Sequence, residues 1–224
     1  MDKVARLRGT MIHRSVLHIA GKWLTVDRRF HAKLRAEAMW MAAALTDALK
    51  ADDGAWISAL VDPGGPHWNA FLGDYRSLPP TVRSAVYAPI DVPVKAAVAA
   101  LAEMARVDGW SEIRSEVDSP TAYLMATSKE EKAAAKARCD LLVRRSRPPV
   151  PLIVEIKTGT ESVGEGTLES FRQNTLRMYA RPLSQAIGRS VQYRVLYVSF
   201  AGKTQWSPMR STRGRGAAVR GAQS

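Results

Sequence analysis

The chain has 224 residues, 46% of them hydrophobic, so it can bury a core and does not have the composition of a disordered polymer. Its 33 basic and 21 acidic residues give a formal net charge of +12, which favours a polyanionic partner and nucleic acid first. One cysteine and four histidines without HExxH spacing exclude a disulfide framework and a Cys/His zinc array. No apolar run approaches the roughly 18 residues of a membrane span, and no secretory signal is evident. We therefore expect a cytoplasmic protein with no membrane partner.

Helical patterns run through residues 1–88. Apolar side chains recur at three- and four-residue multiples over residues 2–20, ending at Gly21, and again over residues 27–50. Residues 54–88 hold short helical pieces separated by proline and glycine turn signals. We predict a helical N-terminal region here, to which the sequence assigns no function.

Residues 89–205 alternate between helix and strand patterns. An alanine-rich amphipathic helix is predicted over residues 92–108, followed by a candidate strand at 111–117. Two short β-rich runs follow at 139–143 and 151–157, joined by a basic turn short enough to return the chain antiparallel. This alternation predicts an α/β core.

The core continues with a second amphipathic helix over residues 167–187, which Pro182 should kink and Gly188 should end. The clearest strand pattern in the chain follows at 191–200. Residues 206–224 contain no acid, and their arginines lie among glycine and serine, which predicts a basic, disordered tail.

Two of the predicted strands carry charges that a buried strand does not normally contain. Glu155 and Lys157 lie two residues apart, so they share one face of their strand, roughly 6.6–6.8 Å apart. Antiparallel pairing with the preceding strand can bring Asp140 beside Glu155. Two carboxylates near a lysine suit a hard cation, which can polarise a phosphate and acidify a bound water. The competing interpretation is a surface ion pair between Glu155 and Lys157.

The stretch from 139 to 159, CDLLVRRSRPPVPLIVEIKTG, resembles the PD-(D/E)xK nuclease superfamily. That family has an acid in the second core strand and (D/E)-x-K in the third, which Asp140, Glu155 and Lys157 match; Cys139 replaces the usual proline. The resemblance covers about half the chain. It implies a restriction-endonuclease-like αβββαβ core, a mixed central sheet flanked by helices, and Mg²⁺ as cofactor. It also implies that all three matching residues are catalytic and that Asp140 and Glu155 hold the metal.

Family members often add an upstream glutamate to the metal site, and two positions qualify here. Glu103 lies on the predicted helix and Glu116 in the first predicted strand, with Glu116 slightly favoured. The helix after the lysine strand borders the active site in related nucleases, which implies that Gln173 or Arg177 contacts DNA. The RecB-like pairing of a glutamine with a tyrosine four residues later is absent, because Arg177 stands at that place.

These features predict a Mg²⁺-dependent DNA endonuclease, with a type II restriction enzyme acting as a homodimer as the first interpretation. Phage, repair and toxin nucleases share the same core, and the sequence does not separate them. Alternatives from other classes are a non-catalytic nucleic-acid-binding module and a helical interaction protein with an accidental E-x-K. The further candidates for phosphate contacts are Lys136 and Arg138.

Overall fold

The computed structural model describes most of the chain in two compact units. One unit holds the described residues up to Ala102 together with Thr158–Ser162 and Val198–Thr204; the other holds the described residues of Glu103–Lys157, Val163–Tyr197 and Gln205–Ser224. The predicted helix at 27–50 lies outside the described residues, and the predicted boundary at residue 88 stays a prediction. The described residues are 3–22, 71, 73–87, 90–118, 138–145 and 149–212.

The first unit contains the N-terminal helix that the sequence predicts. Helix α1 spans Lys3–Lys22, and its start is tied to the chain near residue 74 because Arg6 pairs with Asp74 at 2.7 Å. Gly9 in α1 allows a close approach, since a Cβ at this position would lie 2.8 Å from Thr158 Oγ1. The shorter helix α5 spans Pro80–Tyr87.

Helix α6 spans Asp91–Val107 and confirms the predicted alanine-rich helix. Asp91 lies in the first turn, where an acid is favourable, and pairs with Lys95 four residues later at 2.9 Å. The stretch Pro80–Val107 is long and apolar enough to cross a membrane by length and composition alone. Of its most apolar window, 47% is buried inside the protein, and the core helix of a soluble protein passes the same test.

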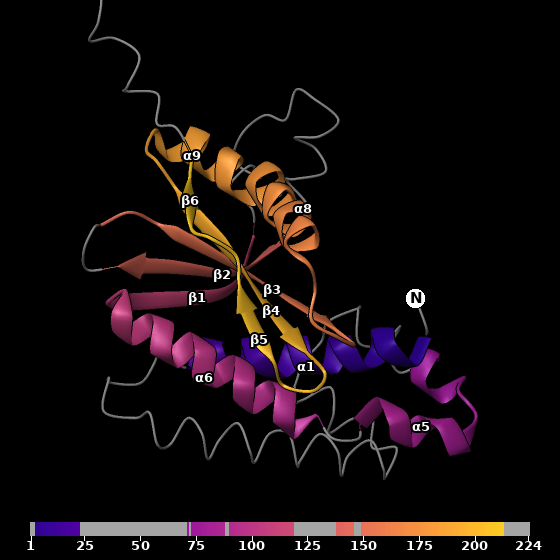
Figure 1. Cartoon of the computed structure of the whole chain (residues 1–224). Coiled ribbons are helices and arrows are strands. Elements are labelled where there is room, and N and C mark those ends of the chain that lie inside the picture. The colour runs from indigo at the N-terminus through magenta and orange to yellow at the C-terminus, as the bar shows by residue number, and fades with distance from the viewer. Residues whose placement is uncertain are drawn as a thin grey trace, which may run out of the picture. The chain divides into compact units, whose positions relative to one another are not determined.

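Six described strands form one sheet in the order β1-β2-β3-β4-β5, with β6 paired to β4 (Figure 1). The strands β1 and β2 are antiparallel, and so are β2 and β3. β4 runs parallel to β3, because Gln192 N–H donates to Pro151 O and Phe200 N–H donates to Gly159 O, both at 2.8 Å. The predicted single mixed sheet and the α/β class are confirmed. The bounds are β1 Trp110–Asp118, β2 Arg138–Arg145, β3 Leu152–Gly159, β4 Gln192–Ser199, β5 Thr204–Trp206 and β6 Arg210–Ser211.

The second amphipathic helix differs from the prediction because it is three segments. Helix α8 spans Glu165–Thr175, a π-helical segment η4 spans Leu176–Ala180, and helix α9 spans Arg181–Ile187. Pro182 lies in the first turn of α9 and has no N–H to donate to the preceding turn. The backbone of that preceding turn, η4, is π-helical. As predicted, Gly188 ends the helix, at a left-handed φ of 63°.

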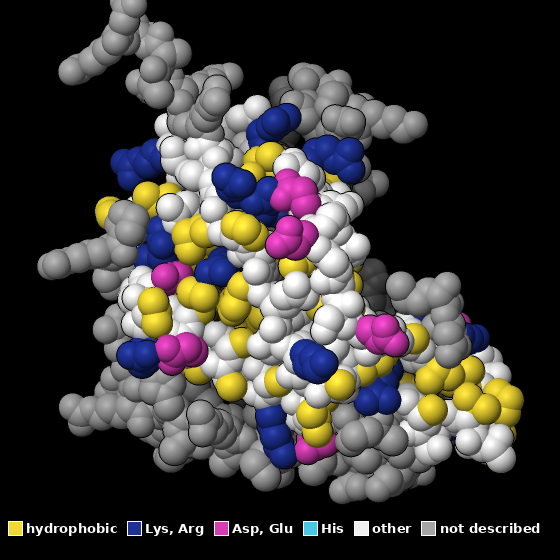
Figure 2. All heavy atoms as spheres, in the orientation of Figure 1, with side chains coloured by type: hydrophobic (Ala, Val, Ile, Leu, Met, Phe, Trp, Pro, Cys, Tyr) yellow, Lys and Arg dark blue, Asp and Glu magenta, His cyan; other side chains and the backbone are white. Residues whose placement is uncertain are grey.

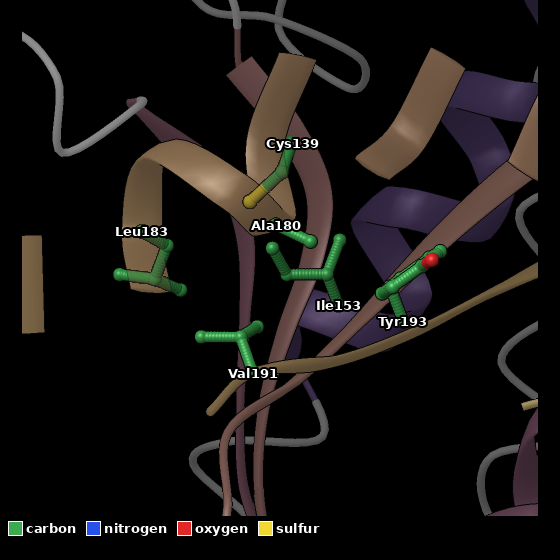
Figure 3. Close-up of a cluster of buried hydrophobic side chains, with 6 residues drawn as sticks. All are labelled: Cys139, Ile153, Ala180, Leu183, Val191 and Tyr193. Carbon is green, nitrogen blue, oxygen red and sulfur yellow. The ribbon is translucent and has the colours of Figure 1, made fainter. Parts of the chain in front are cut away.

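Within the second unit, α8, η4 and α9 lie along one face of the sheet (Figure 1). Side chains from η4, α9 and three strands form a buried apolar cluster, which Figure 3 shows at close range. Fully burying an aliphatic or aromatic side chain of this size contributes about 1.5–3 kcal/mol, so the cluster fixes the helices on this face. Its members are Cys139, Ile153, Ala180, Leu183, Val191 and Tyr193, with Leu142, Leu176 and Tyr179 packed against it.

The predicted disordered tail is wrong for its first seven residues, 206–212. Ser207 exchanges hydrogen bonds with Val195, its Oγ accepting at 2.8 Å and its N–H donating at 2.9 Å. Thr212 N–H donates to Val191 O at 2.9 Å. These bonds add β5 and β6 to the sheet; residues 213–224 lie outside the described residues.

Candidate active site

The pairing register of β2 and β3 places Asp140 opposite Glu155. Leu141 pairs with Val154, the last pair of this ladder, and Leu142 with Ile153, so the next position on each strand after the ladder is Asp140 on β2 and Glu155 on β3. Both Leu142 and Ile153 face the buried cluster under η4 and α9. Glu155 is two residues from Ile153 and shares its face, and the charges of Glu155 and Asp140 both act on Tyr179 of η4, so both carboxylates lie near this helix-covered face. We call them the carboxylate pair.

Both members of the carboxylate pair are buried, with residue exposures of 8% for Asp140 and 4% for Glu155. Asp140 Oδ2 accepts the backbone N–H of Ile156 at 2.7 Å. Lys157 Nζ lies 2.6 Å from Glu155 Oε1, and the Lys157 side chain is 32% exposed. The ion pair between Glu155 and Lys157 that the competing interpretation expected is present, but Glu155 is buried instead of exposed on the surface.

The Lys157 ammonium is held in its charged form by the carboxylate pair. Burial alone lowers the pKa of this lysine, but the charge of Glu155, the hydrogen bond to it and the charge of Asp140 together raise the pKa above its usual value. Lys157 therefore stays protonated at neutral pH. It can donate hydrogen bonds and carry positive charge, but it cannot act there as a general base.

Tyr179 of η4 is a residue that sequence reasoning missed. Burial raises the pKa of its hydroxyl, and the negative charges of Glu155 and Asp140 raise it further. The phenol thus lies within the field of the carboxylate pair and stays neutral at physiological pH. The apolar periodicity of the helix marked Tyr179 as a core residue, and it does pack against the cluster. That the buried apolar cluster lies next to Asp140 and Glu155 follows from the strand register and not from the helix pattern.

The candidate third acid, Glu116, lies in β1 level with the carboxylate pair. Ser115 pairs with Leu141 and Val117 with Cys139, so position 116 is opposite Asp140. The side chain of Glu116 is outside the described part of the structure. The backbone therefore places three acidic positions, on three neighbouring strands, in one row across the sheet.

The other candidate, Glu103, is not brought to this row. It lies on the exposed surface of α6, where its carboxylate pairs with Arg106 at 2.6 Å. Hydrogen bonding to Arg106, together with its charge, holds the pKa of Glu103 below its usual value despite a small opposing effect of burial. Among the described side chains no three His, Cys, Asp or Glu residues form a cluster. Glu103 is thus separate from the carboxylate pair.

The predicted DNA-contacting residues on the helix both lie on its outer surface. Gln173 Nε2 donates to Glu169 Oε1 at 2.6 Å, and Arg177 Nη2 donates to Asn174 Oδ1 at 3.4 Å. Gln173 and Arg177 line the same hollow along α8 and η4. Figure 2 shows basic side chains around these helices, with acidic ones beside them. Lys136 lies outside the described residues, and so does the side chain of Arg138 at the start of β2.

The carboxylate pair fits a hard divalent cation by its chemistry. Two carboxylates from adjacent strands offer oxygen ligands, which Mg²⁺ prefers. The two carboxylates and the Lys157 ammonium lie inside a chain whose net charge is +12. The fold defines an α/β protein with a mixed sheet. No protein-family model, curated protein or solved structure matches the chain.

Proposed function

We propose that the chain is a metal-dependent DNA endonuclease with a restriction-endonuclease-like fold. The observation that carries this proposal is the buried opposition of Asp140 and Glu155, with the Lys157 ammonium 2.6 Å from Glu155. Asp140 and Glu155 would hold Mg²⁺, and Glu116 is the first candidate for a third ligand. When bound, Mg²⁺ supplies a Lewis acid for the phosphate and lowers the pKa of a water.

A role in stability alone does not explain these charges. Taking ions out of water costs several kcal/mol each, and replacing a buried ion pair by apolar residues is often neutral or stabilising. The strand β3 is otherwise apolar at its buried positions, so a hydrophobic pair would suit positions 155 and 157 better for folding. Two buried acids on neighbouring strands favour a site that accepts a metal cation.

The chain's own residues then have separable tasks. Asp140 is oriented by the Ile156 N–H, so its carboxylate is fixed before any ligand arrives. Lys157 keeps its positive charge at the rim of the site, where it would stabilise the negative charge that develops on an attacked phosphate. Tyr179 supplies a neutral hydroxyl that can donate a hydrogen bond in the same region.

The positive charge of the whole chain supports nucleic acid as the substrate. Basic side chains attract the phosphate backbone and release its counterions, which supplies most non-specific affinity. The specific biological role we favour is a type II restriction enzyme that cuts as a homodimer, because duplex cleavage needs two sites. Phage, repair and toxin nucleases remain alternatives to this finer assignment.

The direct test is incubation of the purified chain with supercoiled plasmid in Mg²⁺ and in EDTA. We expect nicked and linear products in Mg²⁺ and none in EDTA, with discrete fragments for a site-specific enzyme and a smear for a nonspecific one. The Asp140→Asn variant is the matched control against a contaminating nuclease. DNA binding by a folded chain without cleavage in Mg²⁺ or Mn²⁺ would instead support a non-catalytic binding module.

A further inference from the structure

A hollow of about 510 Å³ runs along the outer side of α8, η4 and α9. Its described lining is mostly polar and includes Gln173, Asn174, Arg177 and Arg181. We call it the arginine pocket. The two arginines are four residues apart in sequence and are both exposed. Their guanidinium groups are therefore available to a ligand that enters from solvent.

The charges in the arginine pocket are unbalanced. None of the described lining residues is an acid. Arg177 makes one long contact with the neutral amide of Asn174, at 3.4 Å, and Arg181 has no ion pair with any described residue. Glu169 adjoins the lining through its hydrogen bond from Gln173, but its ion pair is with Arg172. Arg177 and Arg181, without ion pairs among the described residues, can attract an anion with several acceptor oxygens. Arginine forks match phosphate oxygens in this way.

The arginine pocket and the carboxylate pair are linked through η4. Ala180 belongs to the buried cluster and Tyr179 packs against it, Leu176 contacts both the cluster and the pocket, and Arg177 lines the pocket. Tyr179, which lies in the field of the carboxylate pair, is two residues from Arg177 and two from Arg181. Two helical residues advance about 3 Å along the axis. The two features therefore lie at one level of the helix.

A DNA strand that reaches the carboxylate pair also presents other phosphates nearby. Each strand carries a phosphate for about every 3.4 Å of helix rise. We infer that the arginine pocket binds a phosphodiester of the cut strand other than the scissile one, with Arg177 and Arg181 as its ligands. This inference rests on the proposed function and adds to it a separate anion subsite that positions the strand.

The first experiment measures DNA binding in EDTA, so that it does not depend on cleavage. The Arg177→Gln/Arg181→Gln variant should bind a labelled duplex at least about ten-fold more weakly, because charge-assisted contacts to phosphate are lost. Its plot of log affinity against log salt should be less steep by about two, one for each phosphate-contacting arginine. Both substitutions are at exposed positions, and thermal unfolding checks that the fold is kept.

The matched control removes two equally exposed charges outside the pocket, as Arg189→Gln/Lys203→Gln. It carries the same net charge as the pocket variant, so a difference between the two reports position and not overall charge. We expect its affinity to stay within about three-fold of the parent. Equal losses in the two variants would overturn the subsite.

The second experiment locates the phosphate. Methylphosphonate groups replace the phosphates of the duplex one at a time, each removing one negative charge. For the parent chain, one position should weaken binding strongly; for the pocket variant, that same position should cost nothing more. A scan in which every position keeps its effect in the variant would overturn the inference. A chain that shows the coupling but never cuts with Mg²⁺ would contradict the nuclease and leave the anion subsite.

Discussion

The two faces of the sheet both hold buried charge, but they hold it differently. On the helix-covered face, Asp140, Glu155 and Lys157 converge from two neighbouring strands. Arg194 of β4 follows Tyr193 of the helix-side cluster, so by strand alternation it lies on the other face. There it is partly buried, and no acid of the described chain forms an ion pair with it.

Arg194 contacts groups from three neighbouring parts of the fold. Its guanidinium lies 4.3 Å from the centroid of the Trp206 ring, and Nη2 donates to Ser207 O at 3.2 Å. Nη1 contacts Met104 Sδ at 3.2 Å, and burial lowers the pKa of this arginine, against the opposing charge of Asp108. These partners are a ring, a carbonyl and a thioether. The cation holds β5 and the end of α6 on β4, which is a structural role.

The comparison shows how a structural role of a buried charge can be distinguished from a functional one. Arg194 is held by a ring and by neutral acceptors from its own fold, although its Nε has no hydrogen-bond partner among the described residues. We propose that the two buried acids on neighbouring strands, with a lysine beside them whose side chain is 32% exposed, serve a ligand instead. Substitutions on the two faces should therefore affect different measurements, cleavage on one and stability on the other.

The largest effect should come from Asp140→Asn. The amide keeps an acceptor for the Ile156 N–H but removes the ligand charge, so the Mg²⁺-dependent rate should fall about 1,000-fold or more, several kcal/mol of transition-state stabilisation. Initial rates of plasmid nicking measure this. Metal-free DNA affinity should stay close to that of the parent, and a variant that still nicks at a parental rate would contradict the site.

Lys157→Ala should follow, with a loss of rate on the order of 100-fold, as for a removed oxyanion donor. Lys157→Arg is the control, since it keeps the charge beside Glu155 but changes the donor geometry. We expect the arginine variant to unfold near the parental temperature and to recover only part of the rate. If Lys157→Ala cuts as fast as the parent, the lysine is merely a partner of Glu155.

Glu116→Gln should have a smaller effect, seen in the metal requirement. If Glu116 is a third metal ligand, its loss should raise the Mg²⁺ concentration for half-maximal rate by about ten-fold or more, since even residues that only orient the ligands contribute roughly 10–100-fold in metal affinity. Glu103→Gln is the matched control on α6 and should leave the Mg²⁺ titration unchanged. A shift with Glu103→Gln and none with Glu116→Gln would exchange the two assignments.

Arg194→Met should have the smallest effect on cleavage, which we expect to be unchanged per folded molecule. It should lower the free energy of unfolding by about 1–2 kcal/mol, because the contacts to the Trp206 ring and the Ser207 carbonyl are lost. Urea denaturation beside a nicking assay separates the two quantities. A strong loss of rate at parental stability would show that the faces are not divided as described.

Much of the sheet could be predicted from the sequence because its strands are local patterns. The runs around 139–143, 151–157 and 191–200 alternate or are continuously apolar, and each became a strand of the sheet. The relation of Asp140 to Glu155 was predicted in outline, since a short basic turn favours antiparallel return. Which residue of β3 lies opposite Asp140 depends on the strand register, and no local sequence pattern determines that register.

Other features could not be predicted because they depend on tertiary contacts. The π segment η4 leaves the apolar stripe of the helix nearly intact. The spacing of apolar residues therefore predicted one continuous helix, whereas the structure has three segments. The short strands β5 and β6 lie in a sequence rich in arginine, glycine and serine, and they are ordered by hydrogen bonds to β4. Arg194 carried no local signal, because its partner Trp206 comes from a segment expected to be disordered.

The hydrogen bond from Ile156 N–H to Asp140 has a consequence for how the protein could evolve. In many enzymes, replacing a charged catalytic residue stabilises the fold, because activity and stability are in conflict. Here the same carboxylate takes the place of a backbone acceptor and fastens β2 to β3 at the row of acids. Truncating it would leave a buried donor without its partner, at about 1–3 kcal/mol. A lineage that lost catalysis would therefore have reason to retain Asp140, or to exchange it for asparagine, long after its chemistry had ceased to matter.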